Sequence, residues 1–208
     1  RFEPPLLELQ RLVRAGELGT LLQVEANFSQ DKFLAMSPDN WRMSEKEAPA
    51  GPMTATGIHM LDLSIGLLGP ARSVLARVGQ LGSNLVNGDT LGVLVTFKNG
   101  ANALISAILA TPFEGRFAVY GSKGWAEVRD KAHPEAPQGW TSTVSLRGRE
   151  KQLTEYPPAQ AVLANLEAFA DAAQGRAPYP VPQEQMLDNI AALEAIFRSA
   201  KTGNIENV

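Results

Sequence analysis

The stretch from 54 to 68 carries the side chains of this sequence whose types and spacing best suit acid–base chemistry. Apolar residues recur there at helical intervals, and at 100° per residue a second face of the predicted helix is polar or small. That face consists of Ala55, His59, Asp62 and Gly66. Because Asp62 follows His59 by three residues, we expect its carboxylate to reach the imidazole, fix the tautomer and raise the histidine pKa. A histidine held in this way, with small neighbours that leave room for a ligand, can act as a general acid or base.

A histidine beside an aspartate on a helix is also a common surface or packing pair, and that alternative stays open. The residues that phosphate binding, nucleophilic hydrolysis or zinc chemistry would need are missing. The sequence has no G-x-x-x-x-G-K-[ST] loop, no G-x-G-x-x-G turn and no G-x-S-x-G elbow. With two histidines, His59 and His133, and no cysteine, no spacing supports a zinc site. We therefore expect neither a metal site nor a cofactor-binding site within these residues.

Composition limits the class of protein further. The 208 residues carry 19 Lys+Arg against 22 Asp+Glu, and this net charge of −3 argues against a nucleic-acid partner. No apolar run approaches the roughly 18 residues of a membrane span, and no signal-peptide pattern is present. A hydrophobic content of 44% suits a single domain over 1–208, and cytoplasm is the default location without cysteines to indicate otherwise. Because the first residue is Arg1 rather than methionine, we expect a fragment or a processed product.

Two periodicities divide the chain into helices and strands. Helical spacing predicts helices at 4–15, 54–68, 163–173 and 186–197. Alternation of apolar and polar residues predicts strands near 21–28, 74–78, 91–97, 103–109, 117–119 and 126–128, with weaker ones near 141–147 and 151–155. Asn99-Gly100 predicts a tight hairpin, since both residues tolerate positive φ, and Gly121–Gly124 predicts another. Antiparallel strands flanked by helices indicate an α+β fold with the helices on one face of the sheet.

An irregular stretch from 30 to 53 separates the first strand from the second helix. Loops of this length inside a compact domain are more often functional than idle, although a disordered excursion is the alternative. It contains Trp41-Arg42, a candidate substrate-facing pair, because the guanidinium of Arg42 can hold a hydroxyl or a carboxylate. A packing tryptophan and a solvated arginine are the alternatives.

With these residues in view, the chain resembles a known family. Gly51–Leu63, which contains Gly57-Ile58-His59-Met60-Leu61-Asp62, resembles the G-x-H-x-x-D segment of the Gfo/Idh/MocA family of NAD(P)-dependent oxidoreductases. Further resemblances follow in the family's order at Gly16–Gly19, Trp41-Arg42, Asp89-Thr90, Phe97–Ala101 and Gly121–Gly124. Together they cover nearly all of the chain, and their joint order is more specific than any one of them.

The resemblance implies the second half of a two-domain enzyme. Its fold would be the C-terminal α/β domain of glucose-fructose oxidoreductase type, an α+β fold with an open, mainly antiparallel sheet, and the Rossmann domain would be absent. The function implied is substrate binding and dimerisation in an enzyme that moves a hydride between NAD or NADP and a small sugar, inositol or diol. The missing N-terminal Rossmann domain would bind the cofactor, so the fragment alone would be inactive. The implied partners are that domain and a second copy bound through the sheet, with no nucleic acid and no membrane.

The resemblance also assigns roles to residues. His59 matches the family histidine that exchanges a proton with the substrate hydroxyl. Many members carry an aspartate four residues earlier, where this chain has Ala55. Asp62 is then the group expected to orient His59, and Thr54 or Thr56 is expected to donate a hydrogen bond to the substrate.

A second class of function stays open beside this one. The replacement at Ala55 favours a non-catalytic sheet module that makes protein–protein contacts only. Phe117 and Trp125 belong either to such an interface or to the core, since an open sheet with an uncovered face must hide it. His133 is expected to be an exposed loop residue without a function.

Overall fold

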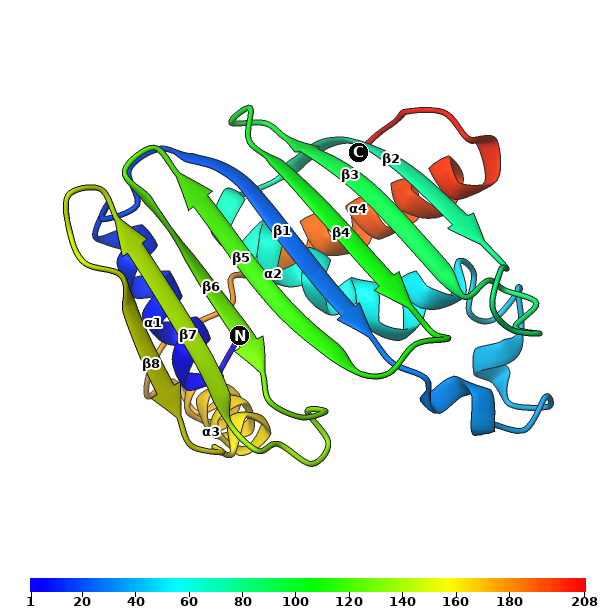
Figure 1. Ribbon diagram of the computed structural model, residues 1–208, viewed down its shortest axis with the longest axis horizontal. Helices are drawn as coiled ribbons and strands as arrows, with labels where there is room; N and C mark the ends of the chain where they lie inside the picture. The colour runs from blue at the N-terminus through cyan, green and yellow to red at the C-terminus, as the bar shows by residue number, and fades with distance from the viewer.

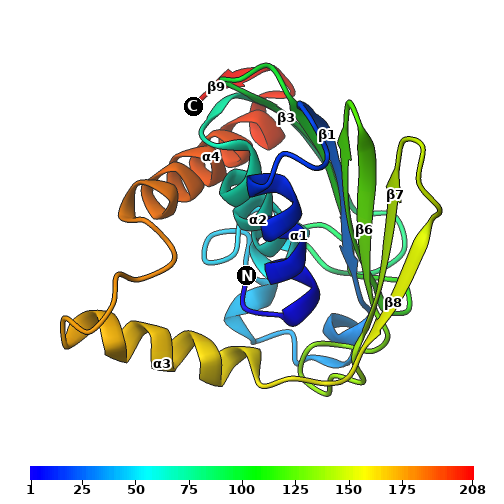
Figure 2. The ribbon, with the colours of Figure 1, turned by 90° about the vertical axis from the view of Figure 1, so that its left-hand side faces the viewer.

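One nine-stranded sheet with the four α-helices on a single face forms the computed structural model, which describes residues 1–208 (Figures 1 and 2). The strands are β1 (Leu21–Ser29), β2 (Ala71–Gly79), β3 (Thr90–Phe97), β4 (Asn102–Ile108), β5 (Glu114–Gly121), β6 (Gly124–Asp130), β7 (Trp140–Leu146), β8 (Gln152–Tyr156) and β9 (Glu206–Asn207). The helices are α1 (Pro4–Arg14), α2 (Ile58–Leu68), α3 (Ala161–Ala173) and α4 (Gln183–Thr202). The predicted α+β fold is confirmed.

The order of strands across the sheet is β8-β7-β6-β5-β1-β4-β3-β2-β9, and only the β1–β4 pair is parallel. Alternation along the strands sends every second side chain into the core, as in β3, where Val93, Val95 and Phe97 are buried. Leu61 and Ile65 of α2 are fully buried in the same core. The sheet and the second helix are thereby fixed relative to each other.

The two predicted hairpins form, but the turn of the first differs from the expected geometry. Gly100 has a φ of 90°, whereas Asn99 is not in the positive-φ region, so only one of the two turn residues uses that freedom. The side chain of Asn99 accepts a hydrogen bond from the amide of Ala101 at 3.0 Å and donates one to the carbonyl of Leu68 at 2.9 Å. Asn99 therefore connects the hairpin to the end of α2 rather than supplying a mirror-image turn.

Helix α3 is the element that departs most from a core role. Its apolar stripe is present as predicted, yet none of its residues is buried, and Leu163, Leu166 and Phe169 are 50%, 59% and 61% exposed. Figure 2 shows α3 extending away from the sheet below α1 and α4. Phe169 makes an edge-to-face contact with Tyr179 of the following loop, with ring centroids 5.9 Å apart, but the stripe stays largely exposed, so most of the apolar face of α3 has no partner here.

Phe117 and Trp125 lie on opposite sides of the sheet. Phe117 is buried with the helices, whereas Trp125 is half-buried beside Tyr120, with ring centroids 6.4 Å apart. None of the helices combines the length and the continuous apolar character needed to cross a bilayer.

Candidate active site

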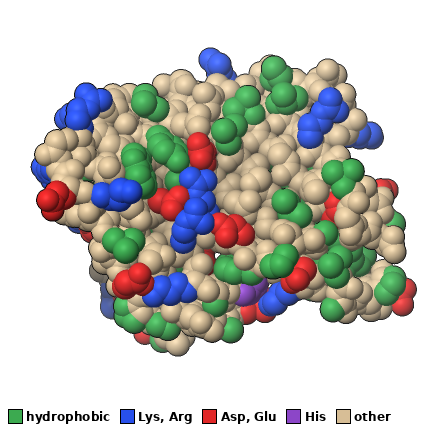
Figure 3. Space-filling model, in the orientation of Figure 1, with side chains coloured by type: hydrophobic (Ala, Val, Ile, Leu, Met, Phe, Trp, Pro, Cys, Tyr) green, Lys and Arg blue, Asp and Glu red, His purple; other side chains and the backbone are tan.

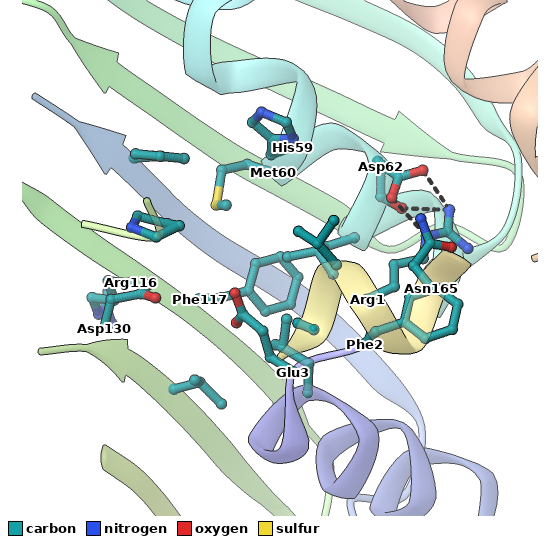
Figure 4. Close-up of a pocket in the computed structure, with 17 residues that line it drawn as sticks. Arg1, Phe2, Glu3, His59, Met60, Asp62, Arg116, Phe117, Asp130 and Asn165 are labelled. Atoms are coloured by element: carbon teal, nitrogen blue, oxygen red, sulfur yellow. Dashed lines mark hydrogen bonds and ion pairs between the residues drawn. The ribbon is translucent and has the colours of Figure 1, made fainter. Parts of the chain in front are cut away.

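A cavity of about 410 Å³ lies between the sheet, α1, α2 and the start of α3, and the two central residues of the predicted site open into it. His59 and Asp62 line it from α2, Phe28 and Phe117 from the sheet, and Glu3 from the residue before α1. Figure 4 shows that these side chains come from segments distant in sequence and surround one space.

The helix that presents His59 begins differently from the prediction. Its spacing predicts an ordinary α-helix from 54, whereas Met53–Gly57 form a π-helical turn and α2 starts at Ile58. The wider turn changes the phase of the helix, so Ala55 packs on the small cluster of Phe33, Met43, Leu85 and Leu109 instead of sharing a face with His59. The predicted four-residue stripe therefore loses its first member.

Gly57 explains why the start of α2 can lie so close to the sheet. A Cβ added at Gly57 would lie 2.9 Å from Sδ of Met53 and 3.1 Å from Cδ2 of Leu91, both closer than ordinary packing allows. A larger residue would force the side chains of Met53 and Leu91 to shift. The glycine of the G-x-H-x-x-D segment thus lets the turn before His59 lie this close to β3.

His59 is exposed at the opening of the cavity, and neither of its ring nitrogens is hydrogen-bonded to another residue. Its ring centroid lies 6.0 Å from that of Phe28. Desolvation by the surrounding protein lowers the pKa of His59, against the opposing effect of the Asp62 charge. Because the residue is exposed, water screens part of this shift. The imidazole is therefore neutral at pH 7 and free to exchange a proton with a ligand.

The prediction that the Asp62 carboxylate accepts a hydrogen bond from His59 is wrong. Asp62 is bound instead by the guanidinium of Arg1, with Nε to Oδ2 at 2.6 Å and Nη2 to Oδ1 at 2.7 Å (Figure 4). Arg1 also donates to the backbone oxygen of Asp62 and to Gln185 of α4. The space over Gly66, predicted to be open for a ligand, is filled by the same guanidinium, which lies 3.0 Å from where a Cβ would be.

Two threonines predicted to donate to a substrate are already bound by the chain. The hydroxyl of Thr54 donates to the carbonyl of Pro49 at 2.6 Å, and that of Thr56 donates to the carbonyl of Pro52 at 3.3 Å. Thr56 is also fully buried. Neither residue lines the cavity, so both assignments are corrected, and both hydroxyls instead hold the π-helical turn.

Trp41 and Arg42 lie outside the cavity as well. They form a short 3₁₀ turn, Trp41–Met43, with the Arg42 guanidinium 4.4 Å from the Trp41 ring centroid. Both side chains are exposed. In this arrangement they bind each other, and the structure does not bring them to His59.

Two carboxyl groups of the cavity were not among the residues expected from the sequence. Burial, together with the nearby charge of Asp130, raises the pKa of Glu3 to about 7. Burial also raises the pKa of Asp130, against a hydrogen bond of 2.8 Å that its Oδ1 accepts from Nε1 of Trp140. These residues are far apart in sequence and share no motif, so only the fold brings them together.

The comparisons with known proteins agree with this architecture. A family model described as the GFO/IDH/MocA C-terminal domain matches residues 6–127. The uncharacterized oxidoreductase YdgJ of Escherichia coli is 26% identical over 219 residues, covering 97% of this chain and 62% of YdgJ. The D-xylose 1-dehydrogenase (NADP(+)) 2 of Haloferax volcanii is 26% identical over 203 residues, covering 98% of this chain and 61% of that enzyme.

A solved structure shares the fold over the whole chain. The aldose-aldose oxidoreductase of Caulobacter crescentus, complexed with glycerol, superposes with a TM-score of 0.84 at 24% identity, covering 100% of this chain and 62% of that one. The chain thus spans about three fifths of the length of the relatives it matches.

The raised pKa of Glu3 predicts a particular dependence of stability on pH. A carboxyl whose pKa is higher in the folded state stabilises the fold below its ordinary pKa of 4.5, and this stabilisation is lost as pH rises through about 7. Replacing Glu3 by Gln removes the titration. We expect the variant to gain about 2 kcal/mol in free energy of unfolding over the natural protein between pH 5 and pH 8.

Urea unfolding at the two pH values measures that gain. Glu184→Gln, at an exposed position of α4, is the matched control and should leave the difference between the two pH values unchanged. A Glu3→Gln effect of the same size at pH 5 and pH 8 would show that Glu3 is not protonated in the folded state.

Proposed function

This chain belongs to the GFO/IDH/MocA family of oxidoreductases, and on that premise we propose that it is the substrate-binding half of an NAD(P)-dependent dehydrogenase acting on a small sugar, inositol or diol. The observation that carries the proposal is the exposed imidazole of His59, unbound by any other residue at the opening of a cavity of about 410 Å³. The similarity to the D-xylose 1-dehydrogenase (NADP(+)) 2 of Haloferax volcanii supports the class of reaction.

This chain alone offers no place for the cofactor's phosphates. No glycine-rich turn connects a strand to a helix N-terminus here, which is how dinucleotide-binding domains hold a pyrophosphate. We assign NAD or NADP to an N-terminal Rossmann domain of the longer protein. The nicotinamide, when bound, accepts or supplies the hydride at the substrate carbon.

The chain's own contribution to the reaction is proton exchange and substrate placement. In the oxidation direction, a neutral ring nitrogen of His59 accepts the proton of the substrate hydroxyl while the carbon that bears this hydroxyl gives up its hydride. In the reverse direction, His59 returns the proton to the substrate oxygen. The lowered pKa keeps His59 unprotonated at pH 7, as the oxidation direction requires. Asp62 acts through Arg1, which ties α2 to the start of the chain and to α4.

The unpartnered face of α3 is where the N-terminal domain would bind. The side chain of Arg1 lies between α2 and α4, and the ring of Phe2 stacks on Tyr179, just after α3, at 6.4 Å. A domain that precedes Arg1 therefore meets α3 first, and its contact with Leu166 and Phe169 would also cover the cavity.

Cytoplasm is the compartment expected for such an enzyme.

The other face of the sheet is the surface proposed for a homodimer. It carries Leu94 and Leu104, 39% and 44% exposed, beside an ion-pair network in which Arg116 contacts Glu25 and Glu127. Figure 3 shows this face, with charged side chains at its centre and hydrophobic ones around them. A face that mixes complementary charges with apolar side chains suits association with a second copy of itself.

The catalytic proposal predicts the effect of removing the imidazole from the full-length protein. We expect His59→Ala to lower turnover about 10²-fold or more, because general acid–base catalysis contributes that much. Natural protein and variant are screened against sugars, inositols and diols with both NAD and NADP. Asn84→Ala, at an exposed loop position, is the control. Unchanged turnover in His59→Ala would remove the histidine from the mechanism and favour a module that makes protein contacts only.

The proposed domain contact predicts that α3 tolerates a charge only when the N-terminal domain is absent. In this chain alone, Phe169→Glu would lose the edge-to-face contact with Tyr179 and cost about 0.5–1.5 kcal/mol. In the full-length protein it would also bury an uncompensated carboxylate, which would add about 2 kcal/mol or more. Thermal unfolding of both lengths measures the difference. Leu153→Glu, at a 67% exposed position of β8, is the control and should behave alike in both. Equal tolerance of Phe169→Glu in both lengths would place the domain contact elsewhere.

The dimer prediction concerns the open face. We expect the protein to run as a dimer or larger by light scattering at micromolar concentration, and Leu94→Glu with Leu104→Glu to shift it to monomer through like-charge repulsion across the interface. Leu81→Glu, at a loop position 84% exposed, should leave the assembly intact. A natural protein that is cleanly monomeric would count against this interface.

A further inference from the structure

Three strand ends meet beside His59 and bring together aromatic residues that the catalytic proposal does not use. β1 ends at Ser29, its antiparallel neighbour β5 begins at Glu114, and β6, antiparallel to β5, ends at Asp130. The residues adjoining these ends therefore lie at one edge of the sheet. They include Phe28 in β1, Phe113 before β5 and His133 in the loop after β6.

The three rings pack as a unit. The ring centroids of Phe28 and Phe113 lie 6.1 Å apart with planes at 88°, and those of Phe113 and His133 lie 5.5 Å apart with planes at 67°. His133 is also 5.9 Å from Phe28. Separations of this kind are the favourable edge-to-face range for aromatic pairs. Phe28 is thus a neighbour of both histidines of the chain, because the ring centroid of His59 also lies 6.0 Å from that of Phe28.

Hydrogen bonds fix His133 in one protonation state, contrary to the expectation of an exposed loop residue. Its Nδ1 accepts from the backbone amide of Glu135 at 3.2 Å, so the ring proton belongs on Nε2, which donates to Oε1 of the buried Gln30 at 2.6 Å. Lys32, itself paired with Glu135, lies 3.5 Å from the same Nδ1 and disfavours a proton there. Desolvation and the charge of Lys32 lower the pKa of His133.

A neutral imidazole with both nitrogens occupied cannot serve as an acid or base. What it offers is its packing surface: fixed by its hydrogen bond to Gln30, the ring packs on Phe28 directly and on Phe113, and so holds Phe28 in place. Phe28 in turn lines the cavity into which His59 opens. The cavity is therefore lined both by carboxyl groups, at Glu3, Asp62 and Asp130, and by aromatic rings, among them Phe28.

Resting on the proposed function, we propose that Phe28 is a specificity-determining residue that binds the C–H face of a ring-form sugar, and that His133 is the positioning residue that holds Phe28 against it. A pyranose ring is rigid and presents a flat set of C–H groups on one side and hydroxyls at its rim. The ring of Phe28 matches the C–H groups of the sugar, and the carboxyl groups of the cavity match its hydroxyls. An open-chain polyol presents no such face and loses rotational freedom on binding, so it binds more weakly.

D-xylose and xylitol test the proposal, because they have the same number of carbon atoms, but D-xylose forms a ring whereas xylitol is an open chain. We measure the binding of each to the full-length protein by saturation-transfer NMR, together with kcat and KM for D-xylose. Phe28→Leu keeps apolar bulk and removes the ring. We expect it to reduce the preference for D-xylose over xylitol about 3- to 10-fold and to raise KM for D-xylose similarly, with kcat nearly unchanged, since an aromatic contact contributes that much.

The second variant pair separates positioning from folding. His133→Ala should reduce the same preference, and His133→Phe should restore most of it, because it returns a ring that packs on Phe28 and Phe113. Phe197→Leu on α4, away from the cavity, is the matched control and should leave the preference unchanged. A His133→Phe variant as impaired as His133→Ala would contradict positioning through the ring.

The outcomes distinguish this inference from the proposed function. Preferential binding of D-xylose without any turnover would contradict the dehydrogenase and support the aromatic subsite. Oxidation of D-xylose with a preference that Phe28→Leu does not change would overturn the subsite and support the dehydrogenase. Equal binding of the two probes by the natural protein, or binding of neither, would also overturn the subsite.

Discussion

The packing of α2 on the sheet is the contact on which the rest of the site depends. Leu61 and Ile65 are fully buried against the strands, so the opposite side of the same helix must face the cavity. His59 and Asp62 lie on that side, one exposed and one bound by Arg1. Because the buried side is continuous with the core of the whole sheet, the direction of the imidazole is set by the same free energy that folds the domain.

The features read from the sequence are those that depend on local periodicity. The strands from β1 to β8 follow from apolar residues at every second position, and the four helices from apolar residues at every third or fourth position. This spacing is enough to recognise the apolar face of an element. The face that carries His59 and Asp62 follows from the same arithmetic, because α2 is a regular helix from Ile58 onward. The approximate place of the site was therefore predictable.

What the sequence did not indicate are the contacts between distant segments. The guanidinium of Arg1 binds Asp62, 61 residues away in sequence, and keeps it from His59. Glu3 likewise lies near Asp130, which is distant from it in sequence. The π-helical turn before α2 depends on packing against β3 at Gly57, so helical spacing alone predicts an ordinary turn. Long-range ion pairs and local changes of helical phase leave no periodic trace, and the assignments at Thr54 and Thr56 failed for that reason.

The position of β1 has a consequence for the way the chain reaches this fold. β4 and β5 are consecutive in sequence and joined by only five residues, 109–113, yet β1 lies between them, parallel to one and antiparallel to the other. Left to themselves, two strands with so short a connection would close on each other as a hairpin. β1 must therefore wait until its two neighbours have been synthesised, some eighty residues later, which makes its insertion between them a nonlocal and intrinsically slow step of folding.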